Sequence, residues 1–422
     1  MTSELRIGCI GAGISGTAQM LNFERFEPGC CVAFSDLTRE NFDRRMEKLF
    51  GRREEEAVHF RADATGVRPE FRDLPYYEDP EEMLAKEDIN TVIIATYCSA
   101  HCEMVRKCVK HGVQILLEKP IATTEEDVEE IWRLLKDYPH LTYVNFTLRG
   151  APAYLAARRH VRGGDIGDVM SVQYVNNVHY GDQYYRQWRR TRARIGSPLL
   201  EKAVHDFDVI NTVINRTPRR VSAFGSMLYY GGDMPNDLTC DQCPKEMDCP
   251  MSVRNRRLLA NRPFPPDYKS GCVFAEEIDI NDNYVVNIEY EGGVTASYNQ
   301  IFHVPVDADR RGGNFIGTEG LMAMEFNGDV DISPAGVISG GRSHIRLWRY
   351  TDRPLSNVFE EYDWGKAGHF GSDIGRAKYE MLKGRRSEAP ATIRDGYVAA
   401  KMAIAAQKSV ESGRVVEIDL AE

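Results

Sequence analysis

The stretch LRIGCIGAGISGTAQMLNF, residues 5–23, decides the fold of the chain. An apolar strand leads into Gly11-x-Gly13-x-x-Gly16 and a helical pattern follows, which is the context that this glycine motif requires. The first glycine makes a tight turn, the second lets the backbone approach a pyrophosphate, and the third lets the helix pack on the strand. The stretch therefore predicts a dinucleotide site at a helix N-terminus, formed by Gly11, Ala12, Gly13, Ile14, Ser15 and Gly16.

An acidic residue follows at the distance expected for a ribose contact. The strand CCVAFSD ends at Asp36, 20 residues after Gly16. A carboxylate there accepts hydrogen bonds from the adenosine ribose and repels a 2′-phosphate, so Asp36 favours NAD over NADP. Arg39 lies close enough in sequence to weaken that preference.

Two further apolar runs, residues 90–96 and 113–120, have the composition of strands that are buried on both faces of a parallel sheet. They end at Thr96 and at Glu118-Lys119-Pro120. Ligands of doubly wound sheets collect at the carboxyl ends of the strands, so Thr96 and Lys119 are predicted to lie where cofactor meets substrate. A lysine at a strand end is often only solvated, but the proline that follows Lys119 fixes its exit from the strand.

Length and charge limit the classes of function. A chain of 422 residues suggests two domains, and a net charge of −10 leaves no basic surplus for nucleic acid or an anionic membrane. No run of 18 apolar residues predicts a membrane span, and the N-terminus lacks the pattern of a signal peptide. A cytoplasmic location is therefore expected, in which the six cysteines among the first 110 residues are reduced core thiols.

The second half of the chain contains candidate substrate residues. A half-buried strand is predicted over 169–180 and an antiparallel meander over 281–302. Tyr174 and Asn176 on the strand, and Trp188 and Arg189 after it, are candidates to contact a sugar ring or a nicotinamide. An equally supported alternative is that the aromatic segment is a loop packed on the sheet.

A helix with an unusual polar edge follows in SPLLEKAVHDFDVINTVI, residues 197–214. Ser197 is a plausible N-cap, Pro198 suits the first helical position, and the apolar residues fill one arc of the helix. Glu201, His205 and Asp208, at i, i+4 and i+7, form a stripe along the border of that arc. The stripe is either an acid/base site or a structural ion network.

The ordered set of these motifs resembles the glucose–fructose oxidoreductase, inositol dehydrogenase and MocA (Gfo/Idh/MocA) family over essentially the whole chain. It comprises AGISG at 12–16, Asp36, Thr96 with His101, EKP at 118–120, VNFTLRGAP at 144–152, GGDIGDVMSVQY at 163–174, HDFD at 205–208 and GHFGSD at 368–373. The resemblance implies an α/β Rossmann domain over 1–148. It also implies an α+β domain over 149–422 with a large open, mostly antiparallel sheet, and a homodimer or homotetramer formed through that sheet.

The family likeness also implies site residues. The lysine of EKP and the acidic residue and histidine of a D-x3-H motif surround the reacting carbinol in this family, which here are Lys119, Glu201 and His205. Glu201 replaces the usual aspartate, so its role is less secure than that of His205. Cofactor contacts are expected from Thr96, His101, Glu118, Lys119, Pro120 and Trp188, and substrate contacts from Tyr174, Asn176, Arg189 and His205.

A cysteine-rich insert, about residues 233–275, carries Cys240-x2-Cys243-x5-Cys249 and then Cys272. The C-x2-C spacing lets two thiolates share one metal tetrahedrally, and four thiolates with no open position make a structural zinc site. Reduced free thiols and an iron–sulfur cluster are the alternatives. The insert is expected to be remote from the hydride chemistry.

Three functions fit these motifs. The leading one is hydride transfer between NAD(P) and a carbinol of a sugar, polyol or sugar derivative, with His205 taking the hydroxyl proton. The second is a glycosidase or lyase that retains NAD and oxidises a ring hydroxyl transiently before elimination. The third is a non-catalytic dinucleotide-binding regulator, which would leave the convergence of Lys119 and His205 without a purpose.

Overall fold

The computed structural model describes residues 4–50, 66–260, 270–305, 308–328, 331–332, 338–339, 342–351, 358–363, 372–384 and 391–421. These residues form two compact units. Unit 1 comprises Met1–Leu155, Val204–Val209 and Trp364–Lys401, and unit 2 comprises Ala156–Ala203, Ile210–Asp363 and Met402–Glu422. This division differs from a single cut at 148/149, because two later segments join the N-terminal residues in unit 1.

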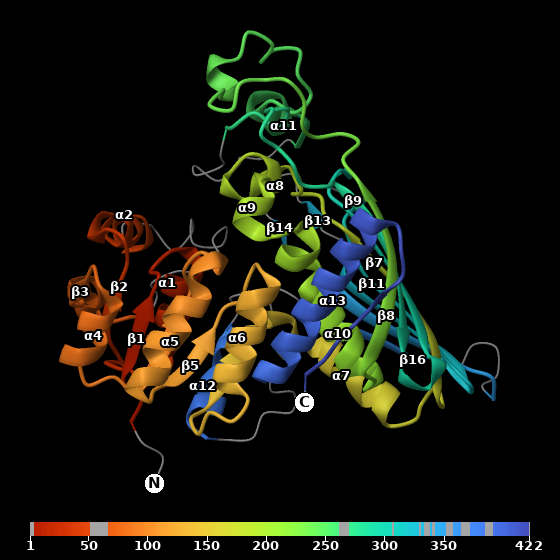
Figure 1. The fold of residues 1–422 in the computed structure, drawn as a ribbon, viewed down its shortest axis with the longest axis horizontal. Helices are drawn as coiled ribbons and strands as arrows, with labels where there is room; N and C mark the ends of the chain where they lie inside the picture. The colour runs from red at the N-terminus through yellow and green to blue at the C-terminus, as the bar shows by residue number, and fades with distance from the viewer. Residues whose placement is uncertain are drawn as a thin grey trace. The chain divides into compact units, whose positions relative to one another are not determined.

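Unit 1 contains a six-stranded parallel sheet (Figure 1). Its strands are β1 (Ile7–Ile10), β2 (Cys31–Ser35), β3 (Tyr76–Tyr77), β4 (Thr91–Ile94), β5 (Gln114–Leu117) and β6 (Thr142–Val144). Their order, β3-β2-β1-β4-β5-β6, is that of a Rossmann fold. Every residue of β1 and β4 is buried, as expected for apolar strands covered on both faces.

The helices of unit 1 are α1 (Ile14–Phe26), α2 (Arg39–Phe50), α4 (Pro80–Lys86), α5 (His101–His111), α6 (Glu125–Leu135) and α12 (Ser372–Leu382). Although α12 comes late in the chain, it packs on α1, where the rings of Phe26 and Tyr379 lie 5.6 Å apart. The first part of α13 (Ile393–Ser412) packs on α6, where Trp132 stacks on Tyr397.

Unit 2 is built on a nine-stranded sheet of order β16-β15-β12-β11-β7-β10-β9-β8-β17. The strands are β7 (Val169–Asn177), β8 (Pro218–Ser226), β9 (Asn283–Tyr290), β10 (Thr295–Ile301), β11 (Arg310–Gly317), β12 (Gly320–Gly328), β15 (Arg342–Arg349), β16 (Val358–Asp363) and β17 (Val416–Glu417). Only β7 and β10 pair in parallel; the other pairs in this sheet are antiparallel. The predicted fold class is therefore confirmed.

The helices of unit 2 among the described residues include most of α7 (Pro152–Arg162), α8 (Asp182–Tyr185), α9 (Arg192–Ile195) and α11 (Val253–Ala260), together with the 3-10 turn η4 (Trp188–Arg190). Helix α10 (Val204–Ile214) is divided, since Val204–Val209 belongs to unit 1 and the rest of the helix to unit 2. Residues 402–412 of α13 bond to the sheet through Ser409, whose hydroxyl accepts from the Ala223 amide at 2.9 Å. Within the described ranges, no helix is long and apolar enough to cross a membrane.

The predicted helix over 197–214 begins as expected but is not uniform. Ser197 caps it, since its hydroxyl accepts from the Leu200 amide at 3.1 Å. Residues Leu199–Ala203 are π-helical, and α10 proper begins at Val204. A π turn hydrogen-bonds from i to i+5 and so breaks the 100° spacing. The prediction that Glu201, His205 and Asp208 form one continuous stripe is therefore wrong, because Glu201 lies in the π turn that precedes the regular helix.

Candidate active site

The glycine loop of unit 1 has the geometry of a phosphate site. At Gly11, with φ +90°, an added Cβ would lie 2.6 Å from the carbonyl of Ala95, and at Gly16 it would overlap the Gly11 carbonyl oxygen. An added Cβ at Gly13 would meet no atom within 4 Å, and Gly13 has a β-region backbone. Helix α1 starts directly after Gly13 without a side-chain cap, so its first amides are available to an anion.

This geometry separates folding from cofactor binding. Gly13→Val should leave the fold intact, because the new side chain enters open space at an allowed φ, yet it should abolish NADH binding because the branched side chain fills the path of the pyrophosphate. Titration of NADH fluorescence, with the circular dichroism melt as the folding check, measures both effects. Gly13→Ala should weaken binding less. If Gly13→Val binds NADH normally, the loop does not hold the phosphates.

Asp36 lies at the end of β2, next to this loop. Its carboxylate accepts from the backbone amides of Ala12 at 2.8 Å and Leu37 at 2.7 Å. Arg39 instead turns away, donating to the carbonyls of Leu74 and Arg72 and to Asp43. The arginine that weakened the predicted preference for NAD is thus engaged elsewhere.

Three large apolar side chains are exposed around the same loop: Ile14 by 55%, Leu37 by 76% and Tyr97 by 50%. Each directly follows one of the residues predicted to contact cofactor, Gly13, Asp36 and Thr96. Exposed apolar side chains gathered beside a polar site are typical of a ligand cleft.

Glu118 is the centre of a hydrogen-bond cluster at the end of β5. Its Oε1 accepts from the Ser15 hydroxyl, from Gln19 Nε2 at 2.6 Å and from Asn145 Nδ2 at 2.7 Å. Lys378 on α12 is buried beside it; burial lowers the pKa of Lys378 to about 8, while Glu118 acts in the opposite direction. Of these partners only Ser15 was among the predicted site residues.

Lys119 follows Glu118 and is half-buried, and the peptide bond between Lys119 and Pro120 is cis. His101, at the start of α5, is fully buried, and its Nδ1 lies 3.0 Å from the Pro120 carbonyl oxygen. That contact supports a role for His101 in holding the turn that presents Lys119. A direct contact between His101 and a cofactor remains a prediction.

His205 lies in the first turn of α10 within unit 1. Its ring meets the Phe146 ring edge-on at 5.8 Å, and Phe146 follows Asn145, which bonds to Glu118. Within unit 1, His205 therefore contacts Phe146 while Glu118 accepts a hydrogen bond from the preceding residue, Asn145. The helix that carries His205 and the turn that carries Lys119 are linked through these two neighbouring residues.

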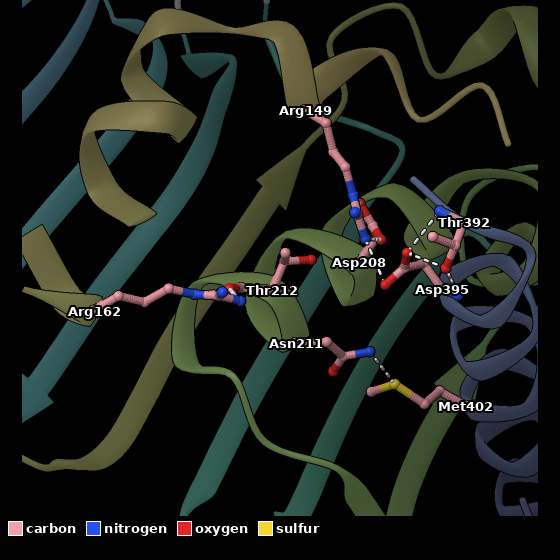
Figure 2. A network of polar contacts seen from close by, with 8 residues as sticks. All are labelled: Arg149, Arg162, Asp208, Asn211, Thr212, Thr392, Asp395 and Met402. Atoms are coloured by element: carbon pink, nitrogen blue, oxygen red, sulfur yellow. Dashed lines mark hydrogen bonds and ion pairs between the residues drawn. The ribbon is translucent and has the colours of Figure 1, made fainter. Parts of the chain in front are cut away.

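An ion network fixes the next turn of the helix (Figure 2). Arg149 forms a bidentate pair with Asp208, with N–O distances of 2.9 and 2.6 Å, and its Nη2 lies 2.9 Å from Asp395. Asp395 in turn accepts from the amide and hydroxyl of Thr392 at the start of α13. Asp208 therefore anchors α10 as a member of a structural ion network, one of the two alternatives for the polar stripe. The partners Arg149 and Asp395 were not anticipated.

A second group of candidate residues gathers in unit 2. Glu201 Oε1 lies 2.9 Å from Arg189 Nε, and the Arg189 guanidinium stacks over Trp188 at 4.5 Å. Lys202 is buried and donates from Nζ to the Tyr180 hydroxyl. Tyr174 and Asn176 are both buried on β7, and the Tyr174 ring lies 6.1 Å from that of Tyr298.

The four insert cysteines line one small cavity in unit 2, together with Arg186, Thr239, Glu246, Met251, Ser252, Val273 and Phe274. The Cys272 sulfur accepts from the Phe274 amide at 3.4 Å, and Cys240 accepts from Arg186 at 3.6 Å. Among the described residues, however, no three of these sulfurs lie within 4.8 Å of one another. Metal binding would therefore require the loops to draw together.

One buried group in unit 1, Glu24 with Cys30 and Cys31, does satisfy that spacing. Glu24 already accepts from Arg68 and from the amides of Gly29 and Cys31, so both of its carboxylate oxygens are engaged by the protein. Burial and the neighbouring Cys30 raise the pKa of Cys31. We therefore regard this group as structural. None of the ten cysteines, all of which lie within the described residues, forms a disulfide, which agrees with the reduced core thiols predicted for the N-terminal six.

Two family models match the chain. Residues 5–146 match an oxidoreductase family with an NAD-binding Rossmann fold, and residues 154–323 match the GFO/IDH/MocA C-terminal domain.

The curated relatives described next are 28% identical to this chain over part of its length. An oxidoreductase named YteT of Bacillus subtilis is 28% identical over 289 residues, which cover 61% of this chain and 66% of that protein. The scyllo-inositol 2-dehydrogenase (NAD(+)) of the same species is 28% identical over 159 residues, 36% of this chain and 43% of that protein. These matches span less than two thirds of either relative. In fold, the chain is similar to a levoglucosan dehydrogenase solved with NADH and levoglucosan, with a TM-score of 0.69, 18% identity, and coverage of 99% of this chain and 100% of that one.

Proposed function

The chain belongs to the Gfo/Idh/MocA oxidoreductase family, and on that premise we propose that it transfers hydride between NAD and a carbinol carbon of a sugar, polyol or sugar derivative. The observation that carries this proposal is that unit 1 joins the glycine loop to the Glu118–Lys119–Pro120 turn, through the bond from Ser15 to Glu118. The phosphate site and the candidate proton-handling lysine are thereby fixed to each other.

The proposed roles follow from side-chain chemistry. A bound nicotinamide supplies the hydride acceptor. His205 takes the hydroxyl proton as general base, and Lys119 stabilises the developing negative charge on the oxygen. Glu201, held by Arg189, orients substrate rather than acting as the base, because its carboxylate already pairs with a cation. Trp188 presents its ring beside Arg189, a surface suited to a sugar.

Preference for NAD rests on Asp36. Its carboxylate is fixed by the Ala12 and Leu37 amides, and a 2′-phosphate near it would meet a negative charge, while Arg39 is occupied by carbonyls. No residue among these offers a cation to an additional phosphate.

The activity is tested by incubating the protein with NAD⁺ and separate panels of polyols, free sugars and glycosides. We expect NADH to accumulate in equal amount with the oxidised product, with NADP⁺ giving a lower kcat/KM. Equal affinity for NADPH and NADH would contradict the role of Asp36. Cleavage of a glycoside without net NADH formation would overturn the dehydrogenase proposal in favour of redox-assisted elimination.

A homo-oligomer is proposed through the face of the nine-stranded sheet that points away from α13. The face opposite Ser409 and Gln407 of α13 carries exposed apolar side chains, among them Phe224, Val285, Trp348 and Phe359. A second copy of the chain is the proposed occupant, because a two-fold axis would bring the same apolar face of both copies together. Light scattering that finds only a monomer would contradict this proposal.

A structural zinc ion on Cys240, Cys243, Cys249 and Cys272 is also proposed. Four sulfur donors line one cavity, and zinc binding would draw them together into the tetrahedral arrangement that this metal prefers. The N–H···S bond to Cys272 is of a kind that supports a thiolate ligand.

A further inference from the structure

We infer that Gln300 is a specificity-determining residue, whose side-chain amide binds two neighbouring hydroxyl groups of the sugar or polyol. The inference rests on the proposed function and adds to it a feature that the substrate must carry besides the reacting carbinol. The residues on which it depends all belong to unit 2.

The side chain of Gln300, on β10, is buried without a hydrogen-bond partner. The residue is 1% exposed. In the part of the chain that the structure describes, it is the one side-chain amide whose nitrogen and oxygen are both buried and both lack a partner. A buried donor or acceptor that has left water without a new partner destabilises the folded state. The amide of Gln300 therefore requires a partner from outside the chain, either a ligand or an internal water.

Strand register places Gln300 in a row of buried polar side chains. Gln300 is paired with Asn176 of β7, and Asn176 is paired on its other side with Arg311 of β11. Paired residues of neighbouring strands lie on the same face of a sheet. Asn176 is 2% exposed and Arg311 is 5% exposed. Two residues earlier, Tyr174 is paired with Tyr298, and their rings lie 6.1 Å apart. The row thus extends the surface on which Tyr174 and Asn176 are the predicted substrate contacts.

Tyr184 of α8 connects this row to the segment that carries Arg189. The Tyr184 ring lies 5.0 Å from the ring of Phe302, which is two residues after Gln300. The Arg189 guanidinium lies 5.7 Å from the centre of the same Tyr184 ring. Burial raises the pKa of Tyr184, and the charges of Arg189 and Arg311 act in the opposite direction, so both guanidinium groups lie near this phenol. The buried row and the candidate substrate residue Arg189 therefore share one neighbour.

The chemistry of the amide identifies the group that it binds. Its nitrogen donates hydrogen bonds and its oxygen accepts them. Each of two adjacent hydroxyls can donate and accept, so one can accept from Nε2 while the other donates to Oε1. A carboxylate only accepts and would leave Oε1 of Gln300 unsatisfied, and an apolar substituent would leave both atoms unsatisfied. Arg311 only donates, so it does not change this requirement. A vicinal diol of a sugar or polyol satisfies the amide completely.

The first test measures stability and needs no substrate. Gln300→Met and Gln300→Leu remove the unpartnered amide, so in the absence of sugar at least one of them should melt at or above the temperature of the wild type. Gln173→Met is the control, because Gln173 is exposed on the other face of the same sheet, and its melting temperature should change little. If both Gln300 variants melt more than about 4 °C below the wild type, internal water satisfies the amide and the inference is overturned.

The second test measures substrate discrimination. On the substrate found with the panels of polyols and sugars, Gln300→Met should raise KM by about 10- to 100-fold, as expected for the loss of two hydrogen bonds. The kcat value and the NADH affinity should change little. Deoxy analogues that lack one hydroxyl of the pair should be poor substrates of the wild type, whereas Gln300→Met should no longer distinguish them from the parent substrate. Unchanged discrimination in Gln300→Met would overturn the inference.

A binding measurement separates this inference from the proposed function. If the wild type reduces NAD⁺ with no member of the panels, the proposed dehydrogenase activity fails. Gln300 is then tested by the rise in melting temperature that millimolar myo-inositol and D-glucose produce in the presence of NADH. The rise should be larger for the wild type and for Gln173→Met than for Gln300→Met. Equal shifts in all three proteins would overturn the role of Gln300.

Discussion

His205→Ala and Lys119→Ala should each lower turnover by about 10²- to 10⁴-fold, the usual contribution of a positioned acid/base group. NADH affinity should remain close to that of the wild type, because neither side chain belongs to the glycine loop or to Asp36. The loss should therefore fall on kcat rather than on cofactor binding. Steady-state kinetics on the substrate identified by the polyol and sugar panels, together with NADH titration, measure the two quantities separately.

The pH profile gives a second measure of the same residue. Histidine is the side chain that ordinarily changes charge between about pH 5 and 8, so kcat/KM of the His205→Ala variant should lack a limb in that range. His111→Ala and Lys110→Ala, on the outer end of α5, are matched controls for the loss of a histidine and a lysine. If both site variants retain near-wild-type turnover, the polar residues of α10 are a structural network only.

Glu201 has a different expected signature because of its partner. Glu201→Gln removes one charge of the pair with Arg189 but retains the hydrogen-bonding shape. If the carboxylate only orients other groups, its loss costs less than that of His205 and appears partly in KM. An equal loss in kcat would assign the base role to Glu201.

The sequence was most informative at positions where only glycine fits the backbone geometry. Gly11 and Gly16 approach other backbone atoms too closely for any Cβ, so the spacing of the motif already contained the geometry of the loop. The apolar runs at 90–96 and 113–120 likewise became β4 and β5, with Thr96 and Lys119 just beyond their carboxyl ends. Both the glycine loop and the two strands follow from residues that are close together in the sequence.

Contacts between distant segments were not visible in the sequence. Lys378 reaches the Glu118 cluster from a helix more than 250 residues later, and no periodicity of α12 indicates that partner. The π turn at Leu199–Ala203 is a tertiary effect as well, since the apolar arc of 197–214 fits a regular helix equally well. The prediction of one continuous polar stripe is wrong at that turn, although His205 remains the strongest candidate for the general base.

The second large effect, on the free energy of unfolding, is expected when Arg149 is replaced. Its guanidinium is buried between Asp208 and Asp395, and although burial opposes its charge, these two carboxylates raise the pKa of Arg149. Arg149→Met leaves both carboxylates without their cation, which should cost about 3–5 kcal/mol of unfolding free energy. Arg149→Lys keeps the charge but not the bidentate fork, so its loss should be smaller. Denaturant unfolding followed by circular dichroism measures both variants.

The deficit of Arg149→Met should also depend on pH with a defined sign. Burial raises the pKa of Asp208 to about 6 even though Arg149 acts to lower it, so removal of Arg149 raises that pKa further. A carboxyl whose folded-state pKa lies above its unfolded value makes stability fall as pH rises through the folded value. Near pH 5 Asp208 is mostly protonated in both proteins and the deficit is at its smallest, since only the contacts to Asp395 and the lost hydrogen bonds contribute. Between pH 6 and 8 only the wild type ionises Asp208 readily, and the deficit grows.

The double variant Arg149→Met/Asp208→Asn separates this charge effect from simple loss of packing. Because removal of both members of a buried pair is often nearly neutral, the second substitution should restore part of the stability that the first one loses. Asp208 orients α10, so the folded double variant should still show a lower kcat with unchanged NADH affinity, since His205 sits one turn earlier on the same helix. If the double variant is no more stable than Arg149→Met, or if the deficit does not grow from pH 6 to 8, the network does not act through the buried charge of Asp208.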